Sequence, residues 1–309
     1  MSEYLINLRS SILAGPTDIS VIMPNLPQGV KPKDFYGSGK KFKVLWLLHA
    51  GDGDRNDWLH YTALPAILAS GTARNLSTSR LIPEHEVIAV MPNGLNSDFA
   101  NHPEFSDGYN FSDYFFEELM PFIYNWFPAS DDPKDNFLAG CSMGGAATWM
   151  YGLYHPEKFA AIAPLSSAPK AYGHLEPYRA LSAAEFRAKA MADRKAFPAG
   201  FGNPKAGIHM KEINMITKYP SVGAFLDSYE HTWDRFREVA AAGKLPKTYL
   251  PCGAGCEADD LSCQRVREFK KYAEGLGVNN IVFDFVPGYG HTYEFWRYIM
   301  PKVLASFGI

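Results

Sequence analysis

The stretch Phe137-Leu-Ala-Gly140-Cys141-Ser142-Met143-Gly144 joins a short apolar run to a helical pattern that continues as far as residue 154. It contains G-x-S-x-G in a strand–turn–helix setting, where a serine sits on a sharp turn with its hydroxyl exposed. Glycine at positions 140 and 144 removes the Cβ atoms that would collide where strand and helix approach each other. The pattern predicts Ser142 as a nucleophile and the amide of Met143, at the helix N-terminus, as a donor to an anion.

A serine nucleophile needs a base to accept its proton, and the base needs an acid to orient it. Behind a G-x-S-x-G turn these partners follow in the order acid, then histidine, each in a loop after a late strand. His291 stands in a glycine-rich loop after the apolar run 281–286 and is the expected base. After the run 247–250, Asp259 or Asp260 is the expected acid. The residues alone barely separate the two, since the other would be a carboxylate at the start of the next helix.

The apolar run 42–48 ends in a loop with two interpretations, His49-Ala-Gly51-Asp52-Gly-Asp54-Arg-Asn56-Asp57-Trp58. Asp52, Asp54 and Asn56 resemble the start of a calcium loop, but its sixth position holds aspartate instead of glycine and its twelfth holds alanine instead of an acidic residue. We therefore favour a glycine-rich ligand loop at the carboxyl end of a buried strand. The amide of Gly51 is then the expected second donor, beside that of Met143, of an oxyanion hole.

The rest of the chain alternates strand and helix patterns. Residues 3–24 alternate apolar and polar side chains and are expected to form antiparallel edge strands. Continuous apolar runs, typical of strands buried on both faces, lie at 42–48, 87–91, 137–139, 159–165, 247–250 and 281–286. Helical patterns lie at 112–126 (with Ser112 as the expected N-cap), 143–154, 263–275 and 293–307. The alternation predicts an α/β fold, a mostly parallel sheet with helices on both faces.

Residues 169–246 break this rhythm and are too long for one crossover between strands. They contain helical stretches at 182–196 and 222–242 and many aromatic residues. We interpret them as a helical insertion that forms a partial lid within a single domain spanning residues 1–309. The aromatic side chains either hold this insertion down or contact a substrate, and the sequence favours neither role.

Composition narrows the classes of partner and compartment. The net charge of −3 and the lack of a basic cluster give no reason to expect a nucleic acid or an anionic membrane as partner. No apolar run approaches 18 residues, and the N-terminus lacks the regions of a signal peptide, so we expect a cytoplasmic location. Cys252, Cys256 and Cys263 are spaced C-x3-C-x6-C, without the paired C-x-x-C spacing of structural zinc. We expect neither a metal nor a cofactor.

Four segments of the chain carry the motifs of one known family. They are Leu47-Leu-His-Ala-Gly51 with Asp57-Trp58, Gly140-Cys-Ser-Met-Gly-Gly145 with His155-Pro-Glu-Lys-Phe159, Cys252-Gly253…Asp259-Asp260-Leu261, and Gly288-Tyr-Gly-His291…Phe295-Trp296. In these residues the chain resembles the esterase D-like branch of the α/β-hydrolases. That branch includes tributyrin-type esterases, S-formylglutathione hydrolases, feruloyl and acetylxylan esterases, and mycolyltransferases. The resemblance covers about residues 40–168 and 246–300.

The resemblance implies an α/β-hydrolase fold and a triad of Ser142, His291 and Asp259. It favours Asp259 over Asp260, because the family's acid is followed by one residue and then leucine. Four departures bear on acyl and alcohol preference rather than on the triad. Ala50 replaces a glycine, the segment Gly255-Cys-Glu-Ala258 expands the acid loop, Thr292-Tyr293 lies where tryptophan is common, and residues 169–246 are longer than in small members.

Together these observations predict a serine carboxylesterase that hydrolyses a small-molecule ester through an acyl-enzyme. Short acyl esters are the expected substrates, with acylated carbohydrates and hydroxycinnamoyl esters among the candidates. Two alternatives stay open: an acyltransferase that uses the same triad with an acceptor other than water, and a binding module that has lost turnover. The sequence is silent on the natural ester and on the oligomeric state.

Overall fold

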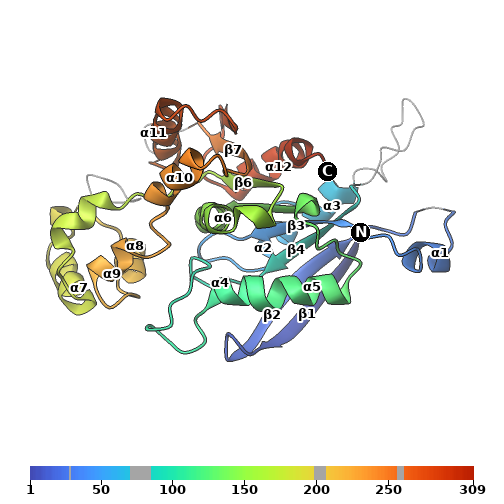
Figure 1. Cartoon of the computed structure of the whole chain (residues 1–309), viewed down its shortest axis with the longest axis horizontal. Coiled ribbons are helices and arrows are strands. Elements are labelled where there is room, and N and C mark those ends of the chain that lie inside the picture. Colours follow the sequence, from blue (N-terminus) through green and yellow to red (C-terminus); the bar gives the residue numbers. More distant parts are fainter. Residues whose placement is uncertain (28, 70–84, 198–206, 256–260) are drawn as a thin grey trace.

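The apolar runs of the sequence form one mixed sheet of eight strands in the described part of the chain (Figure 1). In this computed structural model the described residues are 1–27, 29–69, 85–197, 207–255 and 261–309. The strands are β1 (Ser2–Ser10), β2 (Gly15–Met23), β3 (Lys43–Leu48), β4 (Val87–Pro92), β5 (Asn136–Cys141), β6 (Ala161–Leu165), β7 (Lys247–Gly253) and β8 (Ile281–Val286). Their order in the sheet is β1-β2-β4-β3-β5-β6-β7-β8. β2 pairs antiparallel with both β1 and β4, and the remaining pairs are parallel, which confirms the predicted architecture.

The central strands are buried on both faces, as their continuous apolar sequences predict. Along β3, Trp46 and Leu48 enter one hydrophobic core while Leu45 and Leu47 enter another, because successive side chains of a strand point to opposite faces. The parallel strands β3 to β8 bring their carboxyl ends to one edge of the sheet. The loops expected to hold the site therefore meet at that edge.

Helices cover both faces of the sheet. Outside residues 169–246 they are α1 (Pro32–Tyr36), α2 (Asp57–His60), α3 (Leu64–Leu68), α4 (Phe111–Asp113), the π-helix η2 (Tyr114–Leu119), α5 (Met120–Trp126), α6 (Met143–Tyr154), α11 (Leu261–Gly275) and α12 (Tyr293–Phe307), with 3-10 turns η3 (Pro133–Asp135) and η4 (Pro156–Lys158). On the face of Trp46, side chains of η2, α5, α6 and α11 pack into the core. On the opposite face, α2, α3 and α12 do so.

Local patterns misplaced some helix boundaries. The segment expected to be one helix from Ser112 begins at Phe111, so Ser112 lies inside the helix and does not cap it. Its middle is a π-helix, which ends at Leu119, two residues before Pro121, a residue with no amide hydrogen for a regular helical bond. The short helix α1 was not among the helices that the sequence predicts.

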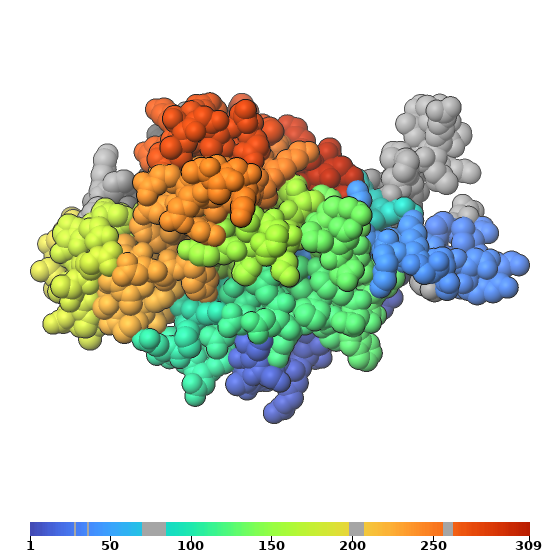
Figure 2. Space-filling model, in the orientation of Figure 1, coloured from blue at the N-terminus to red at the C-terminus, as the bar shows by residue number. Residues whose placement is uncertain are grey.

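The insertion has two parts with different packing. It comprises the 3-10 turns η5 (Gly173–Tyr178) and η6 (Arg194–Ala196) and the helices α7 (Ala183–Ala192), α8 (Met210–Ile216), α9 (Val222–Leu226) and α10 (Thr232–Ala241). The segments from Tyr172 to Leu226 build a hydrophobic core of their own, and α7 to α9 lie together as a lobe at the left of the molecule (Figure 2). In contrast, α10 packs on the main core, where Phe236 meets Trp149 edge-on at 5.9 Å between ring centroids.

The helical stretch predicted over 222–242 consists of two helices, α9 and α10, with residues 227–231 between them. The helix α8 was not predicted at all. Among the helices that the structure describes, none combines the length and the apolar character needed to cross a lipid bilayer.

Candidate active site

Ser142 occupies a strained turn between β5 and α6. Its φ of 55° and ψ of −112° lie outside the regions that side-chain-bearing residues favour. A Cβ atom on Gly140 would lie 2.3 Å from the carbonyl oxygen of Gly144, and one on Gly144 would lie 2.4 Å from that of Leu48. Only glycine fits at either position, as the sequence predicts, so the local chain can hold Ser142 on a sharp turn.

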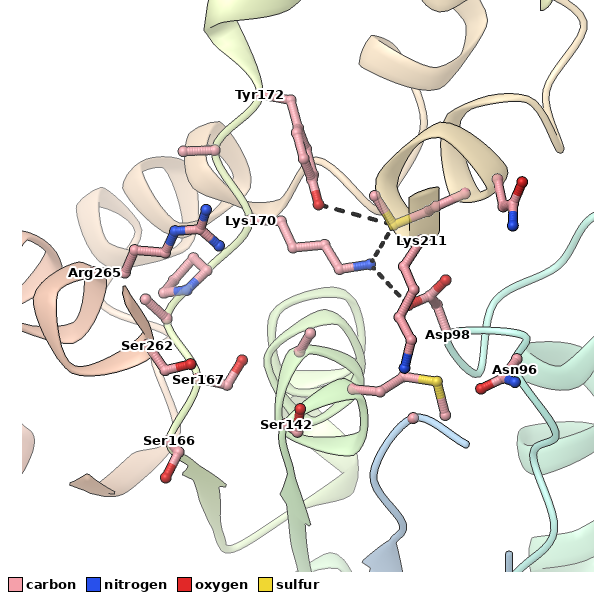
Figure 3. Close-up of a pocket in the computed structure, with 18 of the residues that line it drawn as sticks. Asn96, Asp98, Ser142, Ser166, Ser167, Lys170, Tyr172, Lys211, Ser262 and Arg265 are labelled. Carbon is pink, nitrogen blue, oxygen red and sulfur yellow. Dashed lines mark hydrogen bonds and ion pairs between the residues drawn. The ribbon is translucent and has the colours of Figure 1, made fainter. Parts of the chain in front are cut away.

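A cavity of about 1250 Å³ opens beside this turn. Its walls include Ser142, Met143, Gly51 and His291, which come from three loops at the carboxyl edge of the sheet. Figure 3 shows Ser142 at one end of the space and Lys170 and Tyr172 of the insertion at the other. The tertiary structure thus gathers four of the sequence-predicted site residues around one cavity.

His291 lies in the loop between β8 and α12. Its ring packs edge-on against Trp296, at 5.1 Å between ring centroids, and the indole nitrogen of Trp296 donates to Ser166 Oγ at 3.2 Å. Ser166 itself lines the cavity. These contacts hold the imidazole at the wall of the cavity that Ser142 also borders.

The two candidate acids, Asp259 and Asp260, lie outside the described residues. The chain that leads to them is described, and it packs on the loop of His291. The amide of Gly255 donates to the carbonyl of Tyr289 at 2.8 Å, and a Cβ on Gly253 would lie 2.5 Å from the same oxygen. The loop expected to carry the acid therefore leaves the sheet directly beside the loop that carries His291.

The two expected oxyanion donors are close neighbours. A Cβ atom on Gly51 would lie 3.9 Å from Met143 Cβ. The loop of Gly51 is attached to the start of α6, because the amide of Gly144 donates to the carbonyl of His49 at 3.1 Å. Within the described residues neither the amide of Gly51 nor that of Met143 has a hydrogen-bond acceptor. Two amides of this kind are suited to stabilise a negatively charged oxygen.

His49 connects the loop that carries Gly51 to the loop after β4. The amide of Gly94 donates to His49 Nε2 at 2.9 Å, so Nδ1 carries the proton and donates to the carbonyl of Ala50 at 2.7 Å. Burial lowers the pKa of the imidazole, against the raising effects of the Ala50 carbonyl and of Asp57. The ring is therefore neutral and links the loop after β3 to the loop after β4.

Tyr293 holds the same loop from the side of His291. Its hydroxyl donates to the carboxylate of Asp57 and accepts from the amide of Ala50 at 3.4 Å. Trp58 donates through its indole nitrogen to the carbonyl of Leu48 at 3.2 Å. Sequence reasoning quoted Asp57 and Trp58 as part of a motif and Tyr293 as a departure from one, but it assigned them no contact.

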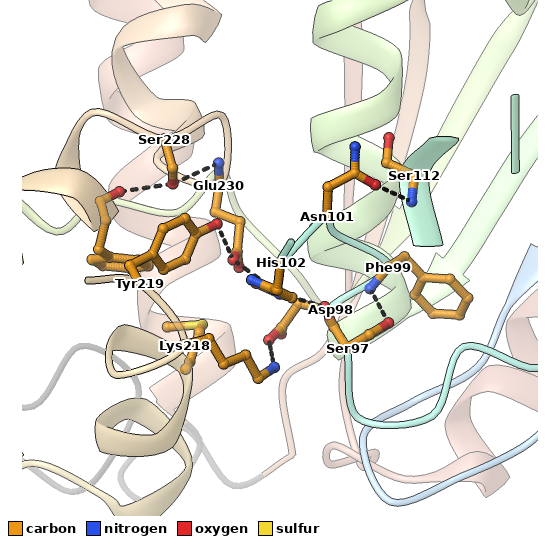
Figure 4. Close-up of polar contacts among 12 residues, drawn as sticks. Ser97, Asp98, Phe99, Asn101, His102, Ser112, Lys218, Tyr219, Ser228 and Glu230 are labelled. Atoms are coloured by element: carbon orange, nitrogen blue, oxygen red, sulfur yellow. Dashed lines mark hydrogen bonds and ion pairs between the residues drawn. The ribbon is translucent and has the colours of Figure 1, made fainter. Parts of the chain in front are cut away.

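The insertion supplies much of the remaining wall through charged residues that the sequence did not single out. Lys170 Nζ lies 2.7 Å from Glu230 Oε2 and 3.4 Å from Asp98 Oδ1. Figure 4 shows Lys218 beside Asp98, where its Nζ lies 3.4 Å from Asp98 Oδ2. Tyr219 donates to Glu230 Oε1 at 2.7 Å. Burial opposes the ionisation of Asp98, but the two ammonium groups outweigh it and hold the pKa of this carboxyl below its ordinary value.

The described residues that the sequence suggested as possible metal ligands make other contacts in the fold. Asp52 pairs with Lys211 and with Asn96, and Asp54 accepts a hydrogen bond from the amide of Asn56 at 2.6 Å. Cys252 and Cys263 are buried in the main hydrophobic core, and Cys256 lies outside the described residues.

Comparison with known proteins shows the family to which the chain belongs. Residues 28–307 match the model of a family described as putative esterase. The chain belongs to this esterase family. It is 27% identical over 303 residues to an acetyl esterase from Caldicellulosiruptor saccharolyticus, and the match covers 96% of this chain and 94% of that protein.

Solved structures of esterases and related hydrolases have the same fold as this chain. The S-formylglutathione hydrolase of Staphylococcus aureus superposes with a TM-score of 0.68 at 21% identity, over 99% of this chain and 98% of that one. A ferulic acid esterase superposes with a TM-score of 0.63 at 21% identity, over 99% and 97% of the two chains. These findings confirm the α/β-hydrolase fold and the resemblance to the esterase D-like branch. The protein is a carboxylic ester hydrolase of the serine class.

Proposed function

We propose that the esterase hydrolyses short acyl esters of polar alcohols, with Ser142 as nucleophile, His291 as base and Asp259 as the acid that orients it. One observation supports this most directly: Ser142 sits on a glycine-flanked turn and shares a single cavity with His291, Gly51 and Met143. Asp260 is the alternative acid.

The proposed chemistry follows from these positions. Ser142 Oγ attacks the ester carbonyl carbon while His291 accepts the hydroxyl proton, and the carbonyl oxygen becomes an oxyanion. The amides of Gly51 and Met143 donate to that oxygen, and each such donor typically contributes on the order of 3 kcal/mol to lowering the barrier. The C–O bond then breaks, and the alcohol leaves with the proton from His291. Water repeats the sequence on the acyl-enzyme and releases the acid.

The composition of the cavity wall supports a polar alcohol. Asn96, Asn214 and several charged side chains line it together with the aromatic rings of Phe105 and Tyr109. Mixed amide, charged and aromatic surfaces suit a ligand that carries hydroxyl groups, such as an acylated carbohydrate, and they also leave room for a hydroxycinnamoyl ring. The similarity to an acetyl esterase supports a short acyl group.

Hydrolysis of p-nitrophenyl acetate, butyrate and octanoate and of a feruloyl ester tests this proposal. We expect acetate or butyrate to be preferred, and Ser142→Ala to lose on the order of 10⁴-fold or more in kcat. Asp259→Asn should lose at least about 100-fold, whereas Asp260→Asn should stay near wild type; the reverse order would make Asp260 the acid. Wild type and Ser142→Ala that are equally slow on every ester would contradict the proposal. Acyl transfer to an added sugar faster than hydrolysis would favour the transferase alternative.

A further inference from the structure

A lysine of the insertion reaches the loop that carries Gly51. Lys211 is the second residue of α8, and its Nζ forms an ion pair with the carboxylate of Asp52, 159 positions earlier in the chain. Figure 3 shows its side chain running from α8 toward Ser142 and the loop below it. The ammonium lies 3.6 Å from the position that a Cβ on Gly51 would occupy. A charge of the insertion therefore lies beside a proposed oxyanion donor.

Asp52 has a structural reason to be in this loop. Its φ of 62° is in the left-handed region, which aspartate and asparagine tolerate better than most residues. Its amide donates to Asn96 Oδ1 at 2.7 Å, and Asn96 Nδ2 donates back to Asp52 Oδ1 at 3.1 Å. This pair of hydrogen bonds fixes the backbone directly after Gly51 and fixes the carboxylate with it.

The negative charge of the Asp52 carboxylate opposes the proposed reaction. The hydrogen bond from Lys211 is the main cause that holds the pKa of Asp52 below its ordinary value, so Asp52 is ionised at neutral pH. Ester hydrolysis creates a second negative charge at the amides of Gly51 and Met143. A carboxylate on the residue next to Gly51 repels such a charge, and like-charge repulsion of about 1.4 kcal/mol at a protein surface is enough to slow the step about tenfold.

We propose that Lys211 is a positioning residue for catalysis, which holds and neutralises Asp52 so that the oxyanion can form beside it. The insertion then contributes to the electrostatics of the catalytic centre and does more than cover it. Lys211 lines the same cavity as Ser142, and in this role it acts through Asp52 rather than on the ester itself. The inference rests on the proposed roles of Ser142 and Gly51.

The exposure of the ion pair separates this role from a structural one. The side chains of Lys211 and Asp52 are 54% and 63% exposed. Exposed ion pairs contribute little to folding stability, because the entropy cost of ordering two long side chains largely offsets their attraction. Removal of the ammonium should therefore change turnover and leave the stability of the fold unchanged.

The test measures kcat and KM on p-nitrophenyl acetate for Lys211→Met, for Lys211→Met with Asp52→Asn, and for Lys189→Met. We expect Lys211→Met to lower kcat about tenfold with little change in KM and in the urea midpoint. Asp52→Asn should restore most of the loss in the double variant, because asparagine keeps the backbone conformation without the charge. Lys189 lies on the exposed side of α7 away from the cavity, so Lys189→Met should behave as wild type.

Salt provides a second readout that a packing role would not show. Raising the ionic strength from 0.01 M to 1 M shortens the screening length from about 30 Å to about 3 Å, so it should recover part of the kcat of Lys211→Met and change wild type less. A kcat of Lys211→Met equal to wild type would overturn the inference, as would a loss that neither Asp52→Asn nor salt relieves. Failure of the proposed function is a different result, since Ser142→Ala would then keep full activity.

Discussion

At the scale of single residues, the geometry around Ser142 depends on the absence of a Cβ atom at Gly144. Gly144 sits where the carbonyl oxygens of Leu48 and His49 would lie 2.4 and 2.7 Å from an added Cβ. Both obstacles are backbone atoms, one at the end of β3 and one at the start of the loop that carries Gly51, so they cannot move aside without displacing that loop. A methyl group at this position would therefore damage the turn and the proposed oxyanion hole together.

We expect Gly144→Ala to cost about 1–3 kcal/mol of unfolding free energy and to abolish most of the esterase activity. Gly152→Ala is the matched control in the same helix, since its nearest obstacle is the end of the Ile162 side chain at 2.8 Å, which can rotate. Urea denaturation and turnover of p-nitrophenyl acetate measure both effects. Equal losses in the two variants would show that the backbone contact at Gly144 is unimportant.

Tyr293 connects the loop of His291 to the loop of Gly51 through one hydroxyl. Tyr293→Phe removes its hydrogen bonds to Asp57 and to the amide of Ala50 and keeps the ring. A hydrogen bond to a charged group contributes about 1.5–3 kcal/mol, so we expect a stability loss of that size and a lower kcat from a displaced oxyanion loop. Tyr61, whose ring packs on Tyr293 at 5.1 Å between centroids, provides the control variant Tyr61→Phe. The prediction fails if the two variants lose the same stability and activity.

At the scale of elements, a buried ion network attaches the insertion to the sheet. The side chains of Glu230 and His102 are fully buried, and that of Lys170 is 12% exposed. Glu230 follows α9, Lys170 begins the insertion, and Asp98 belongs to the loop after β4. These contacts explain why residues 227–231 interrupt the helical stretch that the local pattern predicts over 222–242: Glu230 turns inward to meet Lys170 and Tyr219.

Glu230→Gln should therefore destabilise the esterase by about 2–4 kcal/mol, because it leaves the buried Lys170 with one carboxylate instead of two. Glu176→Gln removes a charge from an exposed pair with Arg179 in the same insertion and should have little effect. Thermal unfolding of both variants compares the two environments directly. A small, equal change in both would contradict an anchoring role of the network.

At the scale of the whole molecule, two buried histidines couple stability to pH. Burial lowers the pKa of His49, and it also lowers that of His102 against the raising effect of Glu230. Each ring is neutral in the fold and takes up a proton more readily when unfolded, near an ordinary pKa of about 6.5. Their contribution to stability is thus complete above that pH and is lost as the pH falls through the lower folded values.

We expect the unfolding free energy, measured with urea at pH 7.5, 6.5 and 5.5, to fall between the last two points. His60 is exposed, so His60→Gln should keep the slope of wild type. A stability that is constant or rises on acidification would show that the buried rings do not resist protonation.

Local sequence patterns predicted the strands of the sheet and the turn that carries Ser142. The runs of apolar residues predicted the strands, and glycine at 140 and 144 predicted the turn, because both depend on neighbours within a few positions. Ser142, His291 and the amides of Gly51 and Met143 were proposed as site groups for the same reason, and their catalytic roles stay predictions. The acid stays a prediction, with Asp259 and Asp260 outside the described residues.

Only the tertiary structure brought together the groups that surround these residues. The bond from Gly94 to His49 spans 45 positions, that from Lys170 to Glu230 spans 60, and that from Lys211 to Asp52 spans 159. A local sequence pattern does not show which distant loops meet at the carboxyl edge of a sheet. Strand order and the packing of the insertion decide which loops meet. The candidate nucleophile could thus be proposed from sequence, whereas the cavity wall and its charges required the fold.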